Sequence, residues 1–106
     1  MGEVVQLQPR PDDYARALRR IKRLWDEGEV EFIPYAQKRM KERNLLPSDA
    51  RDIIKRGRIV GHSKPDDYWR YELEGKLLDG GRASLIVEMA NQLLIINFYP
   101  ANRRRI

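Results

Sequence analysis

A change in the spacing of apolar residues near residue 57 constrains the fold of this chain more than any other feature. In the first half, apolar residues recur at the period of an α-helix, and in the second half they alternate at the period of a half-buried strand. One face of the first helical segment holds Tyr14, Leu18, Ile21 and Trp25. The alternating positions hold Trp69, Tyr71 and Leu73, and then Ala83, Leu85, Val87 and Met89. Helices followed by strands predict an α+β domain, with N-terminal helices packed on a three- to four-stranded antiparallel sheet.

Capping and breaking residues set the boundaries of the expected helices. Asp12 or Asp13 caps a first helix that runs to about residue 27 and stops at Gly28. Pro34 opens a second helix that ends around residues 43–44, and a third follows residues 47–49 and stops at Gly57.

The expected strands cover residues 58–62, 68–73, 83–89 and 93–99, and residues 30–32 form a short extended piece before them. Residues 93–99 are apolar on nearly both faces, which is typical of a central strand. A length of 106 residues predicts a single domain over 1–106. We expect residues 1–11 to form a flexible or edge-strand lead-in and residues 101–106 a flexible tail.

The charge balance indicates an anionic partner. Lysine and arginine number 21 against 16 acidic residues, and the sequence pI is about 9.7, in the range of nucleic-acid binders. Arginine outnumbers lysine 15 to 6, which suits bidentate phosphate binding but is equally explained by a genome whose codon usage favours arginine. The stripe of Arg16, Arg20 and Arg23 on the first helix also fits an ordinary solvated surface.

Several classes of protein are excluded or disfavoured by composition. The chain has no cysteine and a single histidine, so we expect neither a disulfide framework nor a bound metal, and no other cofactor. No signal peptide and no long apolar run is present, which predicts a cytoplasmic protein that does not insert into a membrane.

The second helix carries an unusual pair of like charges. Arg39 and Arg43 lie four residues apart and border the apolar stripe begun by Ala36 and Met40. An anion bound between the two arginines would offset their repulsion. Lys38 and Glu42 form an ordinary i,i+4 pair of opposite sign, which is typical of a solvated surface.

The same stretch resembles a known family. The string from Tyr35 to Leu45, followed by Asp49, Ile53, Ile54 and Gly57, is similar to the His-Ala-x-x-Arg-Met-x-x-Arg-Gly pattern of the DUF4258 family. Arg39 and Arg43 match the arginines of that pattern, and Tyr35 stands at its histidine. This resemblance implies a short helix followed by strands.

A second resemblance extends further along the chain, and the two together span about residues 18–98. Residues 21–24, the Gly28-Glu29-Val30 turn, Trp69 with Tyr71, and a closing strand at 94–98 resemble the MqsR type of toxin in the wider RelE-like group. This resemblance implies a bacterial type II toxin that cleaves messenger RNA without metal, and a cognate antitoxin as its partner.

Metal-independent RNA cleavage requires a group that accepts the 2′-hydroxyl proton, a group that protonates the leaving 5′-oxygen, and cations near the phosphorus. As catalytic residues we predict His62, Glu72 and Arg70, with Tyr99 a further candidate beside the sheet. Each has a structural alternative: His62 can be a packed or solvated histidine, and Arg70 can pair across strands with Glu72, Glu74 or Glu88.

For phosphate and base contacts we predict Arg39, Arg43, Lys64 and Tyr68, the last by stacking on an unpaired base. Three hypotheses therefore stand at this point. The chain is a metal-independent endoribonuclease toxin, a noncatalytic RNA-binding or protein-interaction module on the same scaffold, or a docking surface for an acidic protein.

Overall fold

The computed structural model describes residues 11–101, which form three helices and five strands. In chain order these are α1 (Pro11–Asp26), β1 (Val30–Phe32), α2 (Pro34–Glu42), α3 (Pro47–Arg56), β2 (Arg58–Ser63), β3 (Arg70–Lys76), β4 (Arg82–Met89) and β5 (Leu93–Pro100). The predicted α+β class is confirmed. The predictions for residues 1–10 and 102–106 lie outside the described residues, whereas Pro11 already belongs to α1 and the Ala101 amide is hydrogen-bonded to the Arg82 carbonyl.

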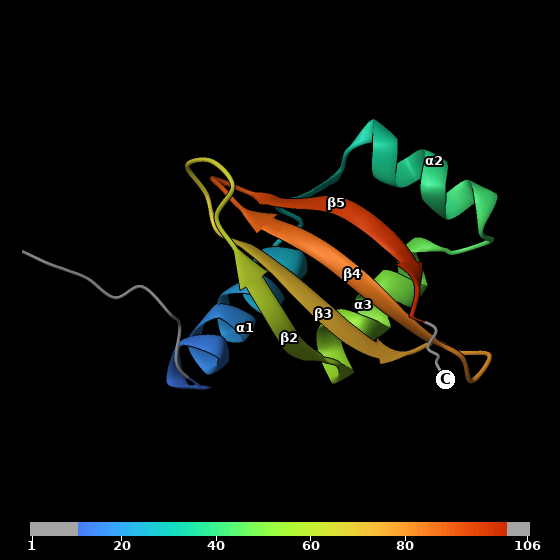
Figure 1. The fold of residues 1–106 in the computed structure, drawn as a ribbon, viewed down its shortest axis with the longest axis horizontal. Coiled ribbons are helices and arrows are strands. Elements are labelled where there is room, and N and C mark those ends of the chain that lie inside the picture. The colour runs from blue at the N-terminus through green and yellow to red at the C-terminus, as the bar shows by residue number, and fades with distance from the viewer. Residues whose placement is uncertain (1–10, 102–106) are drawn as a thin grey trace, which may run out of the picture.

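The sheet differs from the prediction in strand number and direction. Five strands lie in the order β1-β5-β4-β3-β2, and β1 runs parallel to β5, so the sheet is mixed rather than purely antiparallel (Figure 1). The remaining pairs are antiparallel, as predicted. The added strand is the extended piece at residues 30–32. Three residues are too few for an alternating pattern to identify a partner strand.

The helices leave one face of the sheet open. Helices α1 and α3 pack on each other and on the same face of the sheet, and α2 lies beside β5 (Figure 1). The predicted apolar face of α1 points into the core, with Ile21 fully buried. The opposite stripe of Arg16, Arg20 and Arg23 is exposed, as expected of a solvated helix surface.

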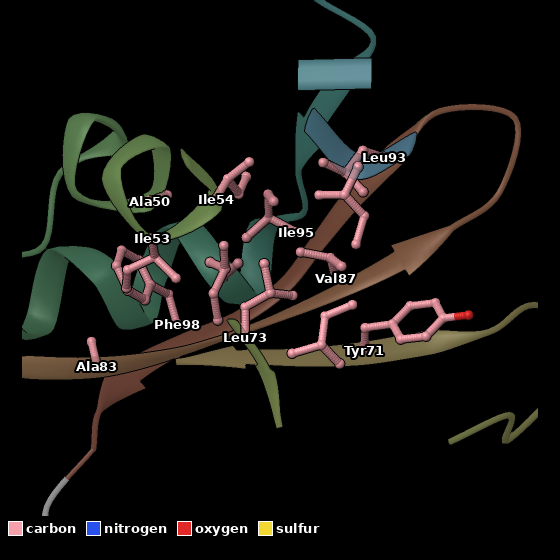
Figure 2. Packing of buried hydrophobic residues seen from close by; sticks show 14 of the residues in the cluster. Ala50, Ile53, Ile54, Tyr71, Leu73, Ala83, Val87, Leu93, Ile95 and Phe98 are labelled. Carbon is pink, nitrogen blue, oxygen red and sulfur yellow. The ribbon is translucent and has the colours of Figure 1, made fainter. Parts of the chain in front are cut away.

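The core lies between these helices and the inner face of the sheet (Figure 2). Its fully buried side chains include Ile53 and Ile54 from α3, Leu73 from β3, and Phe98 from β5. In β3 the buried residues alternate with half-buried polar ones, so Glu72, which lies between the buried Tyr71 and Leu73, points away from the helices. This alternation places the charged positions of β3 on the open face.

Two glycines let α3 approach β3 closely. A Cβ atom on Gly57 would lie 2.6 Å from the Glu74 carbonyl oxygen and 2.6 Å from that of Ile53. A Cβ on Gly75 would lie 3.2 Å from the Gly57 Cα. The end of α3 is therefore fixed against β3, which places the charged residues on both sides of Gly57 beside the end of the sheet.

Candidate functional site

The open face of the sheet carries a hydrogen-bonded pair that can take part in proton transfer. The Tyr99 hydroxyl donates to Glu72 Oε2 across 3.2 Å. Glu72 lies on β3 and Tyr99 on β5, with β4 between them, where Ile86 pairs with Glu72 and Ser84 with Tyr99. Two strand spacings are about 9.5 Å, so only long side chains reaching toward each other over β4 can make this contact.

The pair is tuned by its surroundings. Burial raises the pKa of Tyr99 above its ordinary value of 10.0, and the negative charge of Glu72 and its hydrogen bond raise that pKa further. Tyr99 therefore remains a protonated hydroxyl at neutral pH, a donor beside a carboxylate acceptor. The sequence pointed to both residues as candidates but did not predict their contact.

A hollow of about 250 Å³ lies beside Glu72, and its lining also includes Gly61, Arg70 and Ile86 but not Tyr99. Gly61 pairs with Glu72 in the register of β2 and β3, and a Cβ atom there would meet Glu72 Oε1 only at 3.9 Å. The missing side chain at Gly61 thus leaves space beside the Glu72 carboxylate.

Arg70 lies on the same face as Glu72 and is partly neutralised. Its Nε donates to Glu88 Oε1 at 2.7 Å, across the directly paired positions of β3 and β4. The cross-strand pair that the sequence offered as an alternative is therefore present, with Glu88 as the acceptor. Among the described residues, none forms a hydrogen bond or ion pair with the two terminal nitrogens of Arg70.

His62 lies on the helix side of the sheet, opposite to Glu72. Its Nδ1 is 2.6 Å from the Tyr14 hydroxyl of α1, and its ring lies 5.6 Å from that of Trp69, centroid to centroid. The cause is a register shift in β2 between Ile59 and Gly61, which places His62 opposite the inward-facing Tyr71. The structure thus favours the packing role for the His62 ring, which Tyr14 holds on the helix side, although His62 also contributes to the lining of the hollow that contains Glu72 and Arg70.

Two of the predicted RNA-contacting residues, Lys64 and Tyr68, lie in the loop between β2 and β3. Lys64 Nζ is 5.6 Å from the centre of the Trp69 ring, and the Tyr68 side chain is exposed. Tyr68 precedes β3, which begins at Arg70, so it is a loop residue and not a member of the open strand face.

Arg39 and Arg43 come from a different part of the molecule than Arg70. Helix α2 packs against β5, whereas Arg70 lies on β3, on the far side of β4. Arg39 is 3.6 Å from Glu42 and its guanidinium lies 5.9 Å from the centre of the Tyr35 ring. Arg39 and Arg70 each have a carboxylate of their own, and the structure does not gather the three predicted arginines into one phosphate site.

A basic hollow that the sequence did not predict lies at the end of the sheet, between α3 and strands β2, β3 and β4. This hollow, about 460 Å³ in volume, lies where α3 ends and β2 begins, and four cations line it: Arg56, Arg58, Lys76 and Arg82. The signal in the sequence was the pair of arginines flanking Gly57. Lys76 and Arg82 flank the turn between β3 and β4, and the pairing of β2 with β3 brings this end of the hairpin beside those arginines.

Comparison with models of protein families, with curated proteins and with solved structures finds no match for this chain. Within residues 11–101, no cluster of histidine and carboxylate side chains has the composition of a metal site. Among the helices of that same range, none has the length and apolar character needed to cross a bilayer.

Proposed function

We propose that this chain is a metal-independent endoribonuclease acting on messenger RNA, the toxin of a bacterial type II toxin-antitoxin pair, with its reacting groups on the open face of the sheet. The observation that carries the proposal is the Glu72–Tyr99 hydrogen bond, together with a hollow lined by Glu72 and Arg70 on the sheet face away from the described helices. The resemblance to the DUF4258 family and to the MqsR type of toxin supplies the biological setting.

The reaction assigned to this pair is a transfer of the phosphoryl group within the RNA. Glu72 accepts the proton of a ribose 2′-hydroxyl as its oxygen attacks the adjacent phosphorus. The bond from phosphorus to the 5′-oxygen breaks, and that oxygen takes the proton of the Tyr99 hydroxyl. The proton held by Glu72 then passes to the Tyr99 phenolate across their hydrogen bond, which restores both groups. The products are a 2′,3′-cyclic phosphate and a 5′-hydroxyl.

Arg70 is the cation assigned to the reacting phosphate. It lines the hollow next to Glu72, and Glu88 holds its Nε, which fixes the orientation of the guanidinium. The terminal nitrogens would donate to the non-bridging oxygens as negative charge develops on them.

The test of this function uses purified protein and a labelled RNA oligonucleotide in a chelating buffer. Cleavage to a 2′,3′-cyclic phosphate is expected, and a deoxyribose at the cut position should abolish it because the attacking hydroxyl is gone. Cutting of a fully deoxy substrate would reject the mechanism. In cells, induced expression should arrest growth, and the Glu72→Gln variant should not.

A second candidate function is a noncatalytic RNA-binding or protein-interaction module on the same scaffold. It is favoured by the carboxylates that Arg39 and Arg70 already engage, since paired arginines attract a phosphate less strongly. This candidate predicts salt-sensitive RNA binding with no product and no growth arrest. Binding of an acidic protein without RNA binding would instead identify the basic surface as a docking site for an antitoxin.

A further inference from the structure

We infer that the basic hollow at the end of the sheet binds the RNA backbone next to the cleavage site. Its cations are Arg56 at the end of α3, Arg58 at the start of β2, Lys76 at the end of β3 and Arg82 at the start of β4. The inference rests on the proposed function for the kind of ligand, an RNA phosphodiester, and adds the residues that hold it.

The first support is that three of these cations are available. Arg82 is 3.3 Å from Glu74, whereas Arg56, Arg58 and Lys76 are exposed and form no ion pair with any described residue. They differ in this respect from Arg39 and Arg70, which the sequence favoured as phosphate ligands.

The second support is an unfavourable arrangement of like charges. Lys76 and Arg82 are directly paired across β3 and β4, and like charges at such positions destabilise a sheet. Arg56 and Arg58 add two further positive charges on either side of Gly57. A bound anion would relieve this repulsion.

The balance of charge limits what the hollow can hold. Four cations face two carboxylates, Asp52 and Glu74, so the lining has a formal net charge of +2 (four minus two). Asp52 is buried, Arg51 is 3.7 Å from its Oδ1, and its Oδ2 has no hydrogen-bond partner among the described residues. This small net positive charge matches an RNA backbone, which carries one negative charge per nucleotide. It would not neutralise a ligand in which several phosphates lie close together.

The hollow is also placed correctly relative to Glu72. Glu74, which lines the hollow, is two residues from Glu72 on the same face of β3, and Lys76 is four residues from it. A separation of about 13 Å between positions 72 and 76 lies within the length of a short oligonucleotide. A strand bound at Glu72 can therefore extend over β3 and β4 to these cations.

The test measures the affinity of a fluorescently labelled single-stranded RNA 12-mer as a function of salt, in the Glu72→Gln background so that the probe stays intact. The triple variant Arg56→Gln, Arg58→Gln and Lys76→Gln removes three phosphate contacts and should reduce the magnitude of the slope of log K against log salt by about 2. If the affinities of the triple variant and of its Glu72→Gln parent are equal at 1 M salt, the variant should bind roughly 100-fold more weakly at 0.1 M.

A matched control removes the same charge elsewhere. The triple variant Arg19→Gln, Arg20→Gln and Arg23→Gln loses three exposed cations of α1, and its affinity should change by less than about threefold because none of these residues lines the hollow and salt screens their charge. Equal loss in both triple variants would overturn the inference, since the effect would then come from net charge. Asp52→Asn should act with the opposite sign and tighten binding.

Two further readouts keep the result decisive. Titration of the parent with the same RNA should shift the backbone amide resonances of residues 56–58 and 75–77, and shifts confined to other residues would contradict the inference. If the hollow variants lose binding but the unmodified chain never cleaves RNA, the proposed function fails alone. If the chain cleaves RNA and the hollow variants bind and cleave it normally, this inference fails while the proposed function stands. The basic hollow would then be a candidate binding site for an acidic protein.

Discussion

The contact between Tyr99 and Glu72 can be measured without assuming any activity. The hydroxyl-to-carboxylate distance is 3.2 Å, at the long end for an O–H···O bond, and both side chains are half-buried. A hydrogen bond to a charged acceptor contributes about 1.5–3 kcal/mol, and the length and partial exposure reduce our expectation here to about 1 kcal/mol. Tyr99→Phe should therefore lower the free energy of unfolding by roughly that amount.

The assay is a double-mutant cycle in urea with Tyr99→Phe, Glu72→Ala and the double variant. The expected coupling energy lies between about 0.5 and 1.5 kcal/mol, because each single change already removes the shared hydrogen bond. The control cycle pairs Tyr99→Phe with Glu88→Gln, because the Glu88 carboxylate accepts a hydrogen bond from Arg70 and not from Tyr99. That control should be additive within about 0.5 kcal/mol.

Additivity in the Tyr99–Glu72 cycle, at the level of the control, would refute the geometry from which the acid-base pair was derived. A change of the urea m value in either single variant would show that the substitution altered the extent of unfolding. The energies could then not be compared.

Three other predictions concern the scaffold. Gly57→Ala should lower the free energy of unfolding by about 1–3 kcal/mol, since its Cβ would meet two backbone carbonyls at 2.6 Å; Gly61→Ala, with 3.9 Å available, should be nearly neutral by urea denaturation. Phe98→Ala should lower that free energy by about 3–5 kcal/mol because the ring is fully buried, and a loss below 1 kcal/mol would contradict the described core. Burial is the first cause of the raised pKa values of Tyr71 and Tyr99, so the folded state favours their neutral phenols. Their contribution to the free energy of unfolding is therefore fully present below pH 10 and is lost as the pH rises through the pKa values of the folded state. Stability measured across that range should fall less in Tyr99→Phe than in the parent.

The sequence was sufficient for elements whose pattern is long or whose ends carry strong signals. The helix opened by Pro47 and stopped before Gly57 lies where it was predicted, and so does the strand from Arg82 to Met89. Val30–Phe32 was recognised as extended, but its pairing with β5 depends on α1 returning the chain to the edge of the sheet. No local pattern contains that information.

The candidate site was less predictable, because side-chain partners depend on register. One extra residue near Val60 places His62 on the helix side, where strict alternation would have grouped it with Glu72. Arg70 was correctly placed on the open face, but three carboxylates were equally good partners in the sequence until the pairing with β4 selected Glu88.

The most direct test of the proposed function is the single-turnover rate of RNA cleavage in chelating buffer by the unmodified chain and by Glu72→Gln, purified in parallel. A proton acceptor in the reaction predicts 2′,3′-cyclic phosphate ends and a rate about 10²–10⁴-fold lower in the variant. Equal rates for the two proteins, or no product from either, would contradict it.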